Sequence, residues 1–441
     1  MDIFFPAQTL PLFHVFAPCF TAPGFAYFQS YVWALMVVEG RKCMTRLARC
    51  AFFHQRDLSS WERFLAEHRW SLSAVTDRLV TLVVSKLGAT LPVHGASWLG
   101  KDTTWGAKTA KRMLGGQKGK DHSDNADRGA SLIGHHWNLV GLISPWEARW
   151  LCWPLVLRLV PGLKGARQWV AGATVEPMSF WDAAIAAILE VTRCLGAAAR
   201  RGGADAYYSK APCLNGRWAR GIHGLSRLRQ AAVGWDEPAP RPPGTRGRQP
   251  RHGGQWILAS LLRAETPTRE RLSLYGKLTE VVFVVRDVWL RDVAQKVRVV
   301  VLEGAKEPYI LVSTDLRLSA LQLIESSGAR FSIELTIRDL KQHFGLGDSQ
   351  CTTTLAILRF VHLACLAFCL WRLALIENLN AAWFQVTAAR VSLPEAPLSF
   401  QRVRRALRAW ATRQIMLANA SPGADVEKIE REHAPLLQML R

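Results

Sequence analysis

The stretch Phe331-Ser-Ile-Glu-Leu-Thr-Ile-Arg-Asp-Leu-Lys-Gln-His-Phe344, which directly follows Arg330, organises the rest of the chain. Its apolar residues recur at helical spacing, at Ile333, Ile337, Leu340 and Phe344. An α-helix turns by about 100° per residue, so these side chains form one stripe. The pattern predicts an amphipathic helix whose apolar side packs on a sheet.

The other side of this predicted helix carries charge. Around the helix axis, Arg330 lies about 40° and Lys341 about 20° from Glu334, so one acid is flanked by two bases. Taken alone, this arrangement is read either as a solvated face with ion pairs or as a functional acid held between cations. Other acids in the chain favour the second interpretation.

Composition restricts the class of protein. A chain of 441 residues exceeds what one core usually holds, so two to four structural units are expected. Apolar residues make up 49% of the chain, which excludes disorder of the whole. The net charge of +21 predicts a polyanionic partner, either nucleic acid or an anionic membrane surface. The arginines are spread along the chain, which favours an extended groove for DNA or RNA.

The cysteines and the apolar runs indicate in which cellular compartment the protein is expected. Nine cysteines without a CxxC pair exclude a disulfide framework and a zinc ribbon, and they fit a reducing cytosol. The run 355–376 is the best transmembrane candidate, but Arg359, His362 and Arg372 interrupt it. We therefore interpret this run as a buried helix.

The chain divides into five predicted regions: a helical N-terminal domain over 1–94, an α/β region over 95–230, a β-rich insertion over 231–304, a second α/β part over 305–350 and a helical region over 351–441. Two short helices around 68–71 are read either as a DNA-reading helix-turn-helix or as ordinary packed helices. The insertion contains a Pro/Gly/Arg loop over 236–254 that cannot pack a core. A basic amphipathic helix over 402–413 is read as lying on DNA, as lying on a membrane surface, or as a solvated face.

Strand signals surround two further acids. Within the segment 97–104 a possible strand ends in the acid Asp102, and an apolar strand over 134–143 returns alongside it. Asp205 follows the segment 199–204, which is a poor strand former because of its glycines. Three β-rich runs come later, over 279–290, 296–302 and 308–313. With Glu334, the chain thus offers three separated carboxylates of the type that hold two divalent ions for phosphodiester cleavage.

Several motifs occur together in the order found in one family. They are Asp102-Thr103-Thr104, Gly134-His135, Asp205 to Tyr208, Ser226 to Arg229, Ser313-Thr314-Asp315, and Arg330 with Glu334 and Lys341. In this combination the chain, from about 15 to 350, resembles the DDE transposases of bacterial insertion sequences. The group in question has a ribonuclease-H-like domain interrupted by a β-strand insertion before the catalytic glutamate. The family tyrosine three residues before the arginine is replaced here by Ser327.

The resemblance implies an α/β fold, with a ribonuclease-H-like mixed sheet flanked by helices, an inserted β-subdomain and helical N- and C-terminal regions. It implies that Asp102, Asp205 and Glu334 are catalytic and hold two Mg²⁺ or Mn²⁺ ions. DNA phosphates would be bound by Arg227, Arg229, Arg330, Arg338 and Lys341. Mutual repulsion predicts that the three acids are loosely arranged without metal. In relatives an aromatic residue of the insertion stacks on a flipped base, and here Trp256 or Trp289 either does so or packs within its strand.

The expected function is metal-dependent cleavage at transposon ends and strand transfer into target DNA, that is, cut-and-paste transposition. The expected partner is double-stranded DNA, on which the protein forms a homodimer, with no membrane involved. The expected location is the bacterial cytoplasm, at the nucleoid. The alternative is a catalytically inactive DNA-binding descendant of a transposase.

Overall fold

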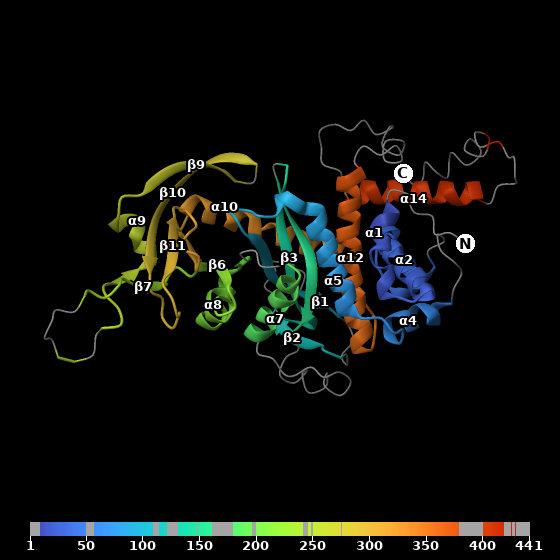
Figure 1. The fold of residues 1–441 in the computed structure, drawn as a ribbon, viewed down its shortest axis with the longest axis horizontal. Coiled ribbons are helices and arrows are strands. Elements are labelled where there is room, and N and C mark those ends of the chain that lie inside the picture. The colour runs from blue at the N-terminus through green and yellow to red at the C-terminus, as the bar shows by residue number, and fades with distance from the viewer. Residues whose placement is uncertain are drawn as a thin grey trace.

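The computed structural model describes residues 9–49, 57–108, 114–120, 131–147, 149–160, 180–195, 200–240, 246–247, 250–274, 276–378 and 400–418, together with 425 and 428. Parts of the predicted loops over 106–131 and 236–254, and much of the predicted helical region beyond 378, therefore lie outside the described residues. Figure 1 shows a long molecule with strands β9 to β11 at one end, helices α1, α2, α4, α12 and α14 at the other, and a sheet between them.

One ten-stranded mixed sheet runs through the molecule in the order β2-β3-β1-β5-β6-β12-β11-β10-β9, and β4 pairs with β3. Its strands are β1 (Ser97–Ala107), β2 (Gln117–Lys120), β3 (Ser131–Trp146), β4 (Arg149–Leu159), β5 (Arg200–Ala204), β6 (Ile222–Leu228), β9 (Thr268–Leu274), β10 (Lys277–Val288), β11 (Val297–Leu302) and β12 (Tyr309–Ser313). A second, two-stranded sheet joins β7 (Val233–Trp235) to β8 (Gln255–Ile257).

The centre of the large sheet has the predicted ribonuclease-H-like arrangement. β1, β3 and β4 pair in antiparallel fashion, and β5 and β6 then run parallel to β1. The predicted return strand is confirmed, with Trp98 opposite Ile143. The expectation that the first strand ends at Asp102 is wrong: β3 continues to pair with β1 as far as Ala107, although the parallel partner β5 ends at Ala204.

The three predicted β-rich runs form β10, β11 and β12, but they do not build a sheet of their own. β12 pairs antiparallel with β6, with Ile310 opposite Leu228, so the inserted strands extend the central sheet. An edge strand has unpaired backbone groups, and this pairing satisfies those of β6. The boundaries of the five predicted regions stay a prediction.

β5 forms despite its unfavourable composition. Gly202 leaves room for the fully buried side chain of Arg217, because a Cβ on Gly202 would lie 2.0 Å from Nη2 of Arg217. Because β5 is also paired on both edges, its stability comes from its neighbours.

Helices cover the sheet and build one end of the molecule. They are α1 (Leu10–His14), α2 (Ala22–Val37), α3 (Met44–Ala48), α4 (Leu58–Ala66), α5 (Leu72–Leu87), α7 (Phe180–Arg193), α8 (Ala211–Trp218), α9 (Leu261–Ala264), α10 (Ala320–Arg330), α11 (Ser332–His343), α12 (Thr354–Asn378) and α14 (Phe400–Ala418). Short 3₁₀ turns are η2 (Ala17–Cys19), η3 (Gly88–Thr90), η4 (Ala206–Ser209) and η5 (Leu258–Ser260). The predicted amphipathic helix is α11, in which Ile333 and Leu340 are buried.

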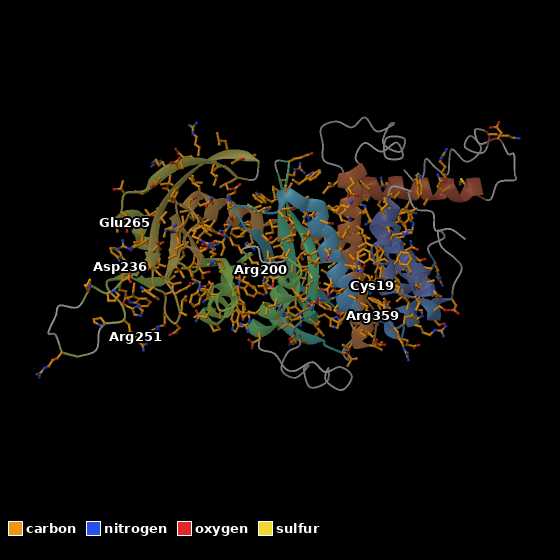
Figure 2. The ribbon with its side chains drawn as sticks, in the orientation of Figure 1. Cys19, Arg200, Asp236, Arg251, Glu265 and Arg359 are labelled. Atoms are coloured by element: carbon orange, nitrogen blue, oxygen red, sulfur yellow. The ribbon has the colours of Figure 1, made fainter. Side chains whose placement is uncertain are left out.

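α12 is the helix that raised the question of a membrane. Among the described residues it alone is long and apolar enough to span a bilayer, and 83% of its most apolar window is buried inside the protein. Phe360, Leu363 and Phe368 are each at most 1% exposed. The buried Arg359, labelled in Figure 2, donates from Nη1 to the carbonyl of Leu65 at 2.8 Å. α12 is thus a core helix, as predicted, and the membrane interpretation loses its main support.

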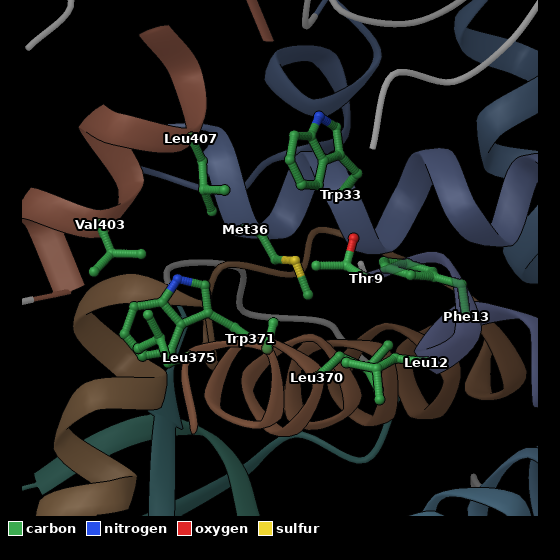
Figure 3. A pocket seen from close by; sticks show the side chains of 11 residues that line it. Thr9, Leu12, Phe13, Trp33, Met36, Leu370, Trp371, Leu375, Val403 and Leu407 are labelled. Atoms are coloured by element: carbon green, nitrogen blue, oxygen red, sulfur yellow. The ribbon is translucent and has the colours of Figure 1, made fainter. Parts of the chain in front are cut away.

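Some residues of the predicted basic helix, α14, pack against the rest of the protein. Figure 3 shows Val403 and Leu407 of α14 at an apolar pocket, together with Trp371 and Leu375 of α12. Arg404 is buried and donates from Nε to the carbonyl of Met36 at 3.0 Å. The guanidinium of Arg404 therefore links α14 to α2 and is not available on the surface. The side chain of Arg402 lies outside the description.

Candidate active site

The pairing of β1 with β5 brings two of the predicted acids together. Lys101 lies opposite Ala204 in this parallel pair, so Asp102 and Asp205 are the next residue on each chain. The backbone of Asp205 is still extended, with φ −69° and ψ 178°. Neighbouring strands lie about 4.8 Å apart and residues in register share a face. Asp102 and Asp205 therefore start from adjacent positions on one face of the sheet.

Local hydrogen bonds fix both carboxylates at this position. Oδ1 of Asp102 accepts from the backbone N–H of Thr103 at 2.7 Å. Oδ1 of Asp205 accepts from the N–H of Tyr207 at 3.1 Å, which caps the 3₁₀ turn η4. The carbonyl of Asp205 accepts from the hydroxyl of Ser226 on β6 at 2.5 Å. The corner after β5 is thereby tied to the next strand.

Helix α11 brings Glu334 to the same face. A Cβ on Gly100, two residues before Asp102 and so on its face, would lie 3.5 Å from Cδ1 of Ile333. The hydroxyl of Thr336 donates to the carbonyl of Cys152 on β4 at 3.1 Å, which holds the helix against the sheet. Glu334 follows Ile333 in the first turn of α11, and its side chain is 47% exposed.

Arg330 lies between Glu334 and β5. It is the last residue of α10 rather than part of α11, yet its Nη2 is 3.1 Å from Oε1 of Glu334 because Phe331 at the junction keeps helical angles. Arg330 is 8% exposed, and its buried Nη1 has no hydrogen-bond partner among the described residues. A buried cationic donor without an acceptor fits an anion such as a phosphate.

The pKa of Asp102 shows that the three acids influence one another. Burial raises the pKa of Asp102 to about 6, and the hydrogen bond from Thr103 opposes this. The charges of Asp205 and Glu334 raise it further, and that of Arg330 lowers it. The face thus concentrates negative charge that its own cations only partly compensate.

The three acids have the right kind of ligand atoms for a metal ion, but their side chains are not arranged around one metal position in this structure. Three carboxylates are the hard oxygen donors that Mg²⁺ and Mn²⁺ prefer. In the part of the chain that the structure describes, no group of three or more His, Cys, Asp or Glu side chains is close enough to hold a metal ion. In this structure the side chain of Glu334 pairs with Arg330 instead.

The remaining predicted DNA-binding residues lie on the surface. Arg227 on β6 and Arg229, just after the end of this strand, are exposed, and the guanidinium of Arg227 lies 4.2 Å from the ring centre of Tyr309. Arg338 is exposed on α11 and pairs with the adjacent Asp339, and Lys341 is exposed in the last turn of the same helix.

The two tryptophans predicted as base-stacking candidates belong to the β-rich end. Nε1 of Trp256 donates to Asp236 at 2.6 Å, and the guanidinium of Arg286 covers its ring at 4.3 Å. Figure 2 labels Asp236 in this part of the molecule, apart from Arg200 at the start of β5. The backbone of Trp289 pairs with that of Trp235. These contacts favour the interpretation of both residues as packed strand tryptophans.

Sequence reasoning missed a buried polar cluster on the opposite face of β1. Lys101 is fully buried; its Nζ lies 3.1 Å from Oδ1 of Asn138 and 3.4 Å from the ring centre of Tyr208. The hydroxyl of Tyr208 also donates to Asn138, at 3.2 Å. Burial lowers the pKa of Lys101 to about 7. The available signal was a lysine between the apolar residues Trp98 and Leu99 and the acid Asp102.

Comparisons with known families agree with this geometry. A model described as DDE superfamily endonuclease matches residues 15–279, and one described as transposase DDE domain matches residues 203–370. The first covers more than half of the chain, so the protein belongs to the DDE superfamily of endonucleases and transposases. No curated protein matches the chain. The predicted resemblance to DDE transposases is confirmed, and an origin in a bacterial insertion sequence stays a prediction.

Proposed function

We propose that the protein is a DNA transposase that cuts at transposon ends in a metal-dependent reaction and joins the freed end to target DNA. Its membership of the DDE endonuclease and transposase families supports nuclease-type chemistry. The observation that carries the finer proposal is the register of β1 and β5, which starts Asp102 and Asp205 side by side. Double-stranded DNA is the proposed partner, and a homodimer on DNA the proposed assembly, because two ends must be joined.

The proposed metal ligands are Asp102, Asp205 and Glu334, and DDE superfamily enzymes generally use divalent metals. When bound, two Mg²⁺ or Mn²⁺ ions would activate the attacking oxygen and stabilise the leaving one. The chain's own contribution would be to start Asp102 and Asp205 from adjacent strand positions and to carry Glu334 on α11. Glu334 would exchange its ion pair with Arg330 for the metal site, and Arg330 would then offer its guanidinium to a DNA phosphate.

The reaction has two balanced steps. Water attacks a phosphodiester at the element's end, breaks the bond to the 3′ oxygen and leaves a 3′ hydroxyl and a 5′ phosphate. This 3′ hydroxyl then attacks a target phosphodiester, joins to its phosphorus and releases a target 3′ oxygen that takes up a proton. The exposed Arg227, Arg229, Arg338 and Lys341 would hold phosphates along the strand. We place this activity in the bacterial cytoplasm, at the nucleoid.

A second candidate is a DNA-binding descendant without catalytic activity. One observation favours it: the side chain of Glu334 is held in an ion pair by Arg330. This candidate predicts DNA binding that does not depend on the acids.

A cleavage assay on the element's flanking DNA with Mg²⁺ separates the two candidates. We expect Glu334→Gln to reduce cutting by at least about a hundredfold, since the neutral amide is a poor metal ligand. The matched control is Glu280→Gln on β10, whose side chain is 59% exposed. Equal cutting by parent and Glu334→Gln would show that Glu334 is not a catalytic acid.

A further inference from the structure

The buried polar cluster behind β1 joins the two segments that carry Asp102 and Asp205. Lys101 directly precedes Asp102 on β1, and Tyr208 lies in η4, which begins directly after Asp205. Oδ1 of Asn138 on β3 accepts from Nζ of Lys101 at 3.1 Å and from the hydroxyl of Tyr208 at 3.2 Å. One amide oxygen therefore links both acid-bearing segments, on the face of the sheet opposite to Asp102.

The three side chains of this cluster are held on all sides. Lys101 and Asn138 are 0% exposed, and Tyr208 is 1% exposed. Nζ of Lys101 also lies 3.4 Å from the ring centre of Tyr208, in a cation–π contact. The same ring meets that of Trp181 on α7 edge-on, with centroids 6.0 Å apart. Packing of this kind leaves the hydroxyl of Tyr208 little freedom to leave Asn138.

The backbone pairing of β5 ends before Asp205. β5 itself ends at Ala204, and its pairing with β6 ends one residue earlier. The carbonyl of Asp205 accepts from the hydroxyl of Ser226 at 2.5 Å and from the N–H of Tyr208 at 3.1 Å, which ties this corner to β6 and to η4. The separation of Asp205 from Asp102 across β1 therefore depends on side-chain contacts as well as on strand pairing.

The cluster ties the same corner to β1 and β3. Asn138 precedes Leu139, the residue that pairs with Asp102. A shift of η4 away from β1 would leave the buried hydroxyl of Tyr208 without this acceptor, which costs free energy. Burial of the Lys101 ammonium is itself costly, and an apolar side chain at this position would avoid that cost. Core packing alone thus does not explain a lysine here.

We propose that Lys101, Asn138 and Tyr208 are positioning residues, which hold the backbones of Asp102 and Asp205 at the separation that bound metal ions require. They act from behind the sheet and do not themselves contact the metal. This inference rests on the proposed function, because it assumes that the two acids are metal ligands. Residues that orient metal ligands typically change metal affinity by about 10- to 100-fold when they are replaced.

Tyr208→Phe tests the proposal because it removes the hydroxyl and keeps the ring. Tyr31→Phe is the matched control: Tyr31 is 0% exposed in α2, and its hydroxyl donates to Sδ of Met44 at 3.2 Å. Each variant of the full chain loses one buried hydroxyl. Mn²⁺ titration followed by electron paramagnetic resonance measures affinity, and urea denaturation without metal measures stability. Asp102→Asn identifies the Mn²⁺ binding that belongs to the acids.

We expect Tyr208→Phe to weaken this Mn²⁺ binding by about tenfold or more. Tyr31→Phe should change it by less than about twofold, although both variants unfold at a somewhat lower urea concentration than the parent. Unchanged Mn²⁺ affinity in Tyr208→Phe, or an equal loss in both variants, would refute the positioning role while the proposed function stands. If the parent shows no Mn²⁺ binding that depends on Asp102, both proposals fail.

Lys101→Met tests the same link independently and decides the question if Tyr208→Phe does not fold. The substitution keeps an unbranched side chain and removes the other donor to Asn138. Loss of a positive charge would by itself strengthen the binding of a divalent cation. We expect the opposite, a weakening of Mn²⁺ binding by about fivefold or more. Unchanged or tighter binding by Lys101→Met would contradict the positioning role.

Discussion

The carboxylates near the two ends of β5 have opposite pKa shifts, lowered at the beginning of the strand and raised at its end. At its beginning, Arg201 is 2.8 Å from Asp315, and the two side chains are 6% and 1% exposed. Burial raises the pKa of Asp315, but hydrogen bonds from Arg317 and Arg201 outweigh it and hold the pKa well below its ordinary value. At its end, burial raises the pKa of Asp102 to about 6, and the charges of Asp205 and Glu334 add to the rise.

The opposite shifts distinguish Asp315, whose charge stabilises the fold, from Asp102, whose charge is better explained by a function. The Arg201–Asp315 pair is complete within the protein, so ionisation of Asp315 stabilises the fold. The acids at the other end repel one another, so their ionisation costs stability until a cation binds. Perturbed pKa values of this second kind cluster at functional sites.

The largest expected effect comes from breaking the complete pair. Asp315→Leu should lower the free energy of unfolding by about 3–5 kcal/mol, because it leaves the buried Arg201 without its carboxylate. Urea denaturation measures the change. The double variant Arg201→Met/Asp315→Leu removes both charges and should recover most of the loss. A cost below about 1 kcal/mol for the single variant would mean that the pair is not structural.

Asp102→Asn should have the opposite sign. The folded pKa of Asp102, about 6, lies above its ordinary value of 3.8, so the ionised form destabilises the fold at neutral pH. In metal-free buffer at pH 8 we expect the isosteric amide to raise the free energy of unfolding by about 1–3 kcal/mol. Destabilisation by more than about 1 kcal/mol in the same urea experiment would contradict the uncompensated charge.

A pH series should then make the two ends diverge. The cost of ionised Asp102 develops as pH rises from about 4 through about 6, so the gap between Asp102→Asn and the parent should close near pH 4. The contribution of Asp315, whose folded pKa is lowered, is present above pH 4 and should fade as pH falls further. Thermal melts across this range report both trends. If the stability difference between Asp102→Asn and the parent did not change with pH, it would come from packing and not from the charge of Asp102.

Much of the fold was predictable from sequence because its signals are local. Helix α11, the return strand β3 and the runs that became β10 to β12 were all indicated by the spacing of apolar residues along the chain. β5 was harder to predict because its Gly202 makes room for the side chain of Arg217, which lies on another element. The continuation of the sheet from β6 into β12 likewise depends on pairing between distant strands.

In the candidate site, too, some features have a local signal in the sequence and others depend on contacts between distant segments. The three acids were found through motif order, and their adjacency depends on the register between Lys101 and Ala204, which no local pattern encodes. The link from Lys101 through Asn138 to Tyr208 was missed because β1, β3 and η4 are joined only in the folded protein. The tryptophans favoured from sequence, Trp256 and Trp289, have partners in the β-rich end instead.

The smallest expected effect concerns the surface cations. Arg227→Ala removes an exposed side chain that covers the Tyr309 ring, so it should cost less than about 1 kcal/mol of stability. If Arg227 contacts a phosphate, the salt dependence of DNA binding should become shallower by about one charge. Titrations at several salt concentrations measure that slope. An unchanged slope would remove Arg227 from the DNA path.

The central claim is that Asp102, Asp205 and Glu334 together bind divalent metal. Titration with Mn²⁺, followed by electron paramagnetic resonance, tests it most directly in the parent, Asp102→Asn, Asp205→Asn and Glu334→Gln, with the exposed Glu280→Gln as control. We predict saturable binding that each of the three site substitutions weakens by at least about tenfold and the control leaves unchanged. Equal Mn²⁺ binding by all five proteins would contradict the account.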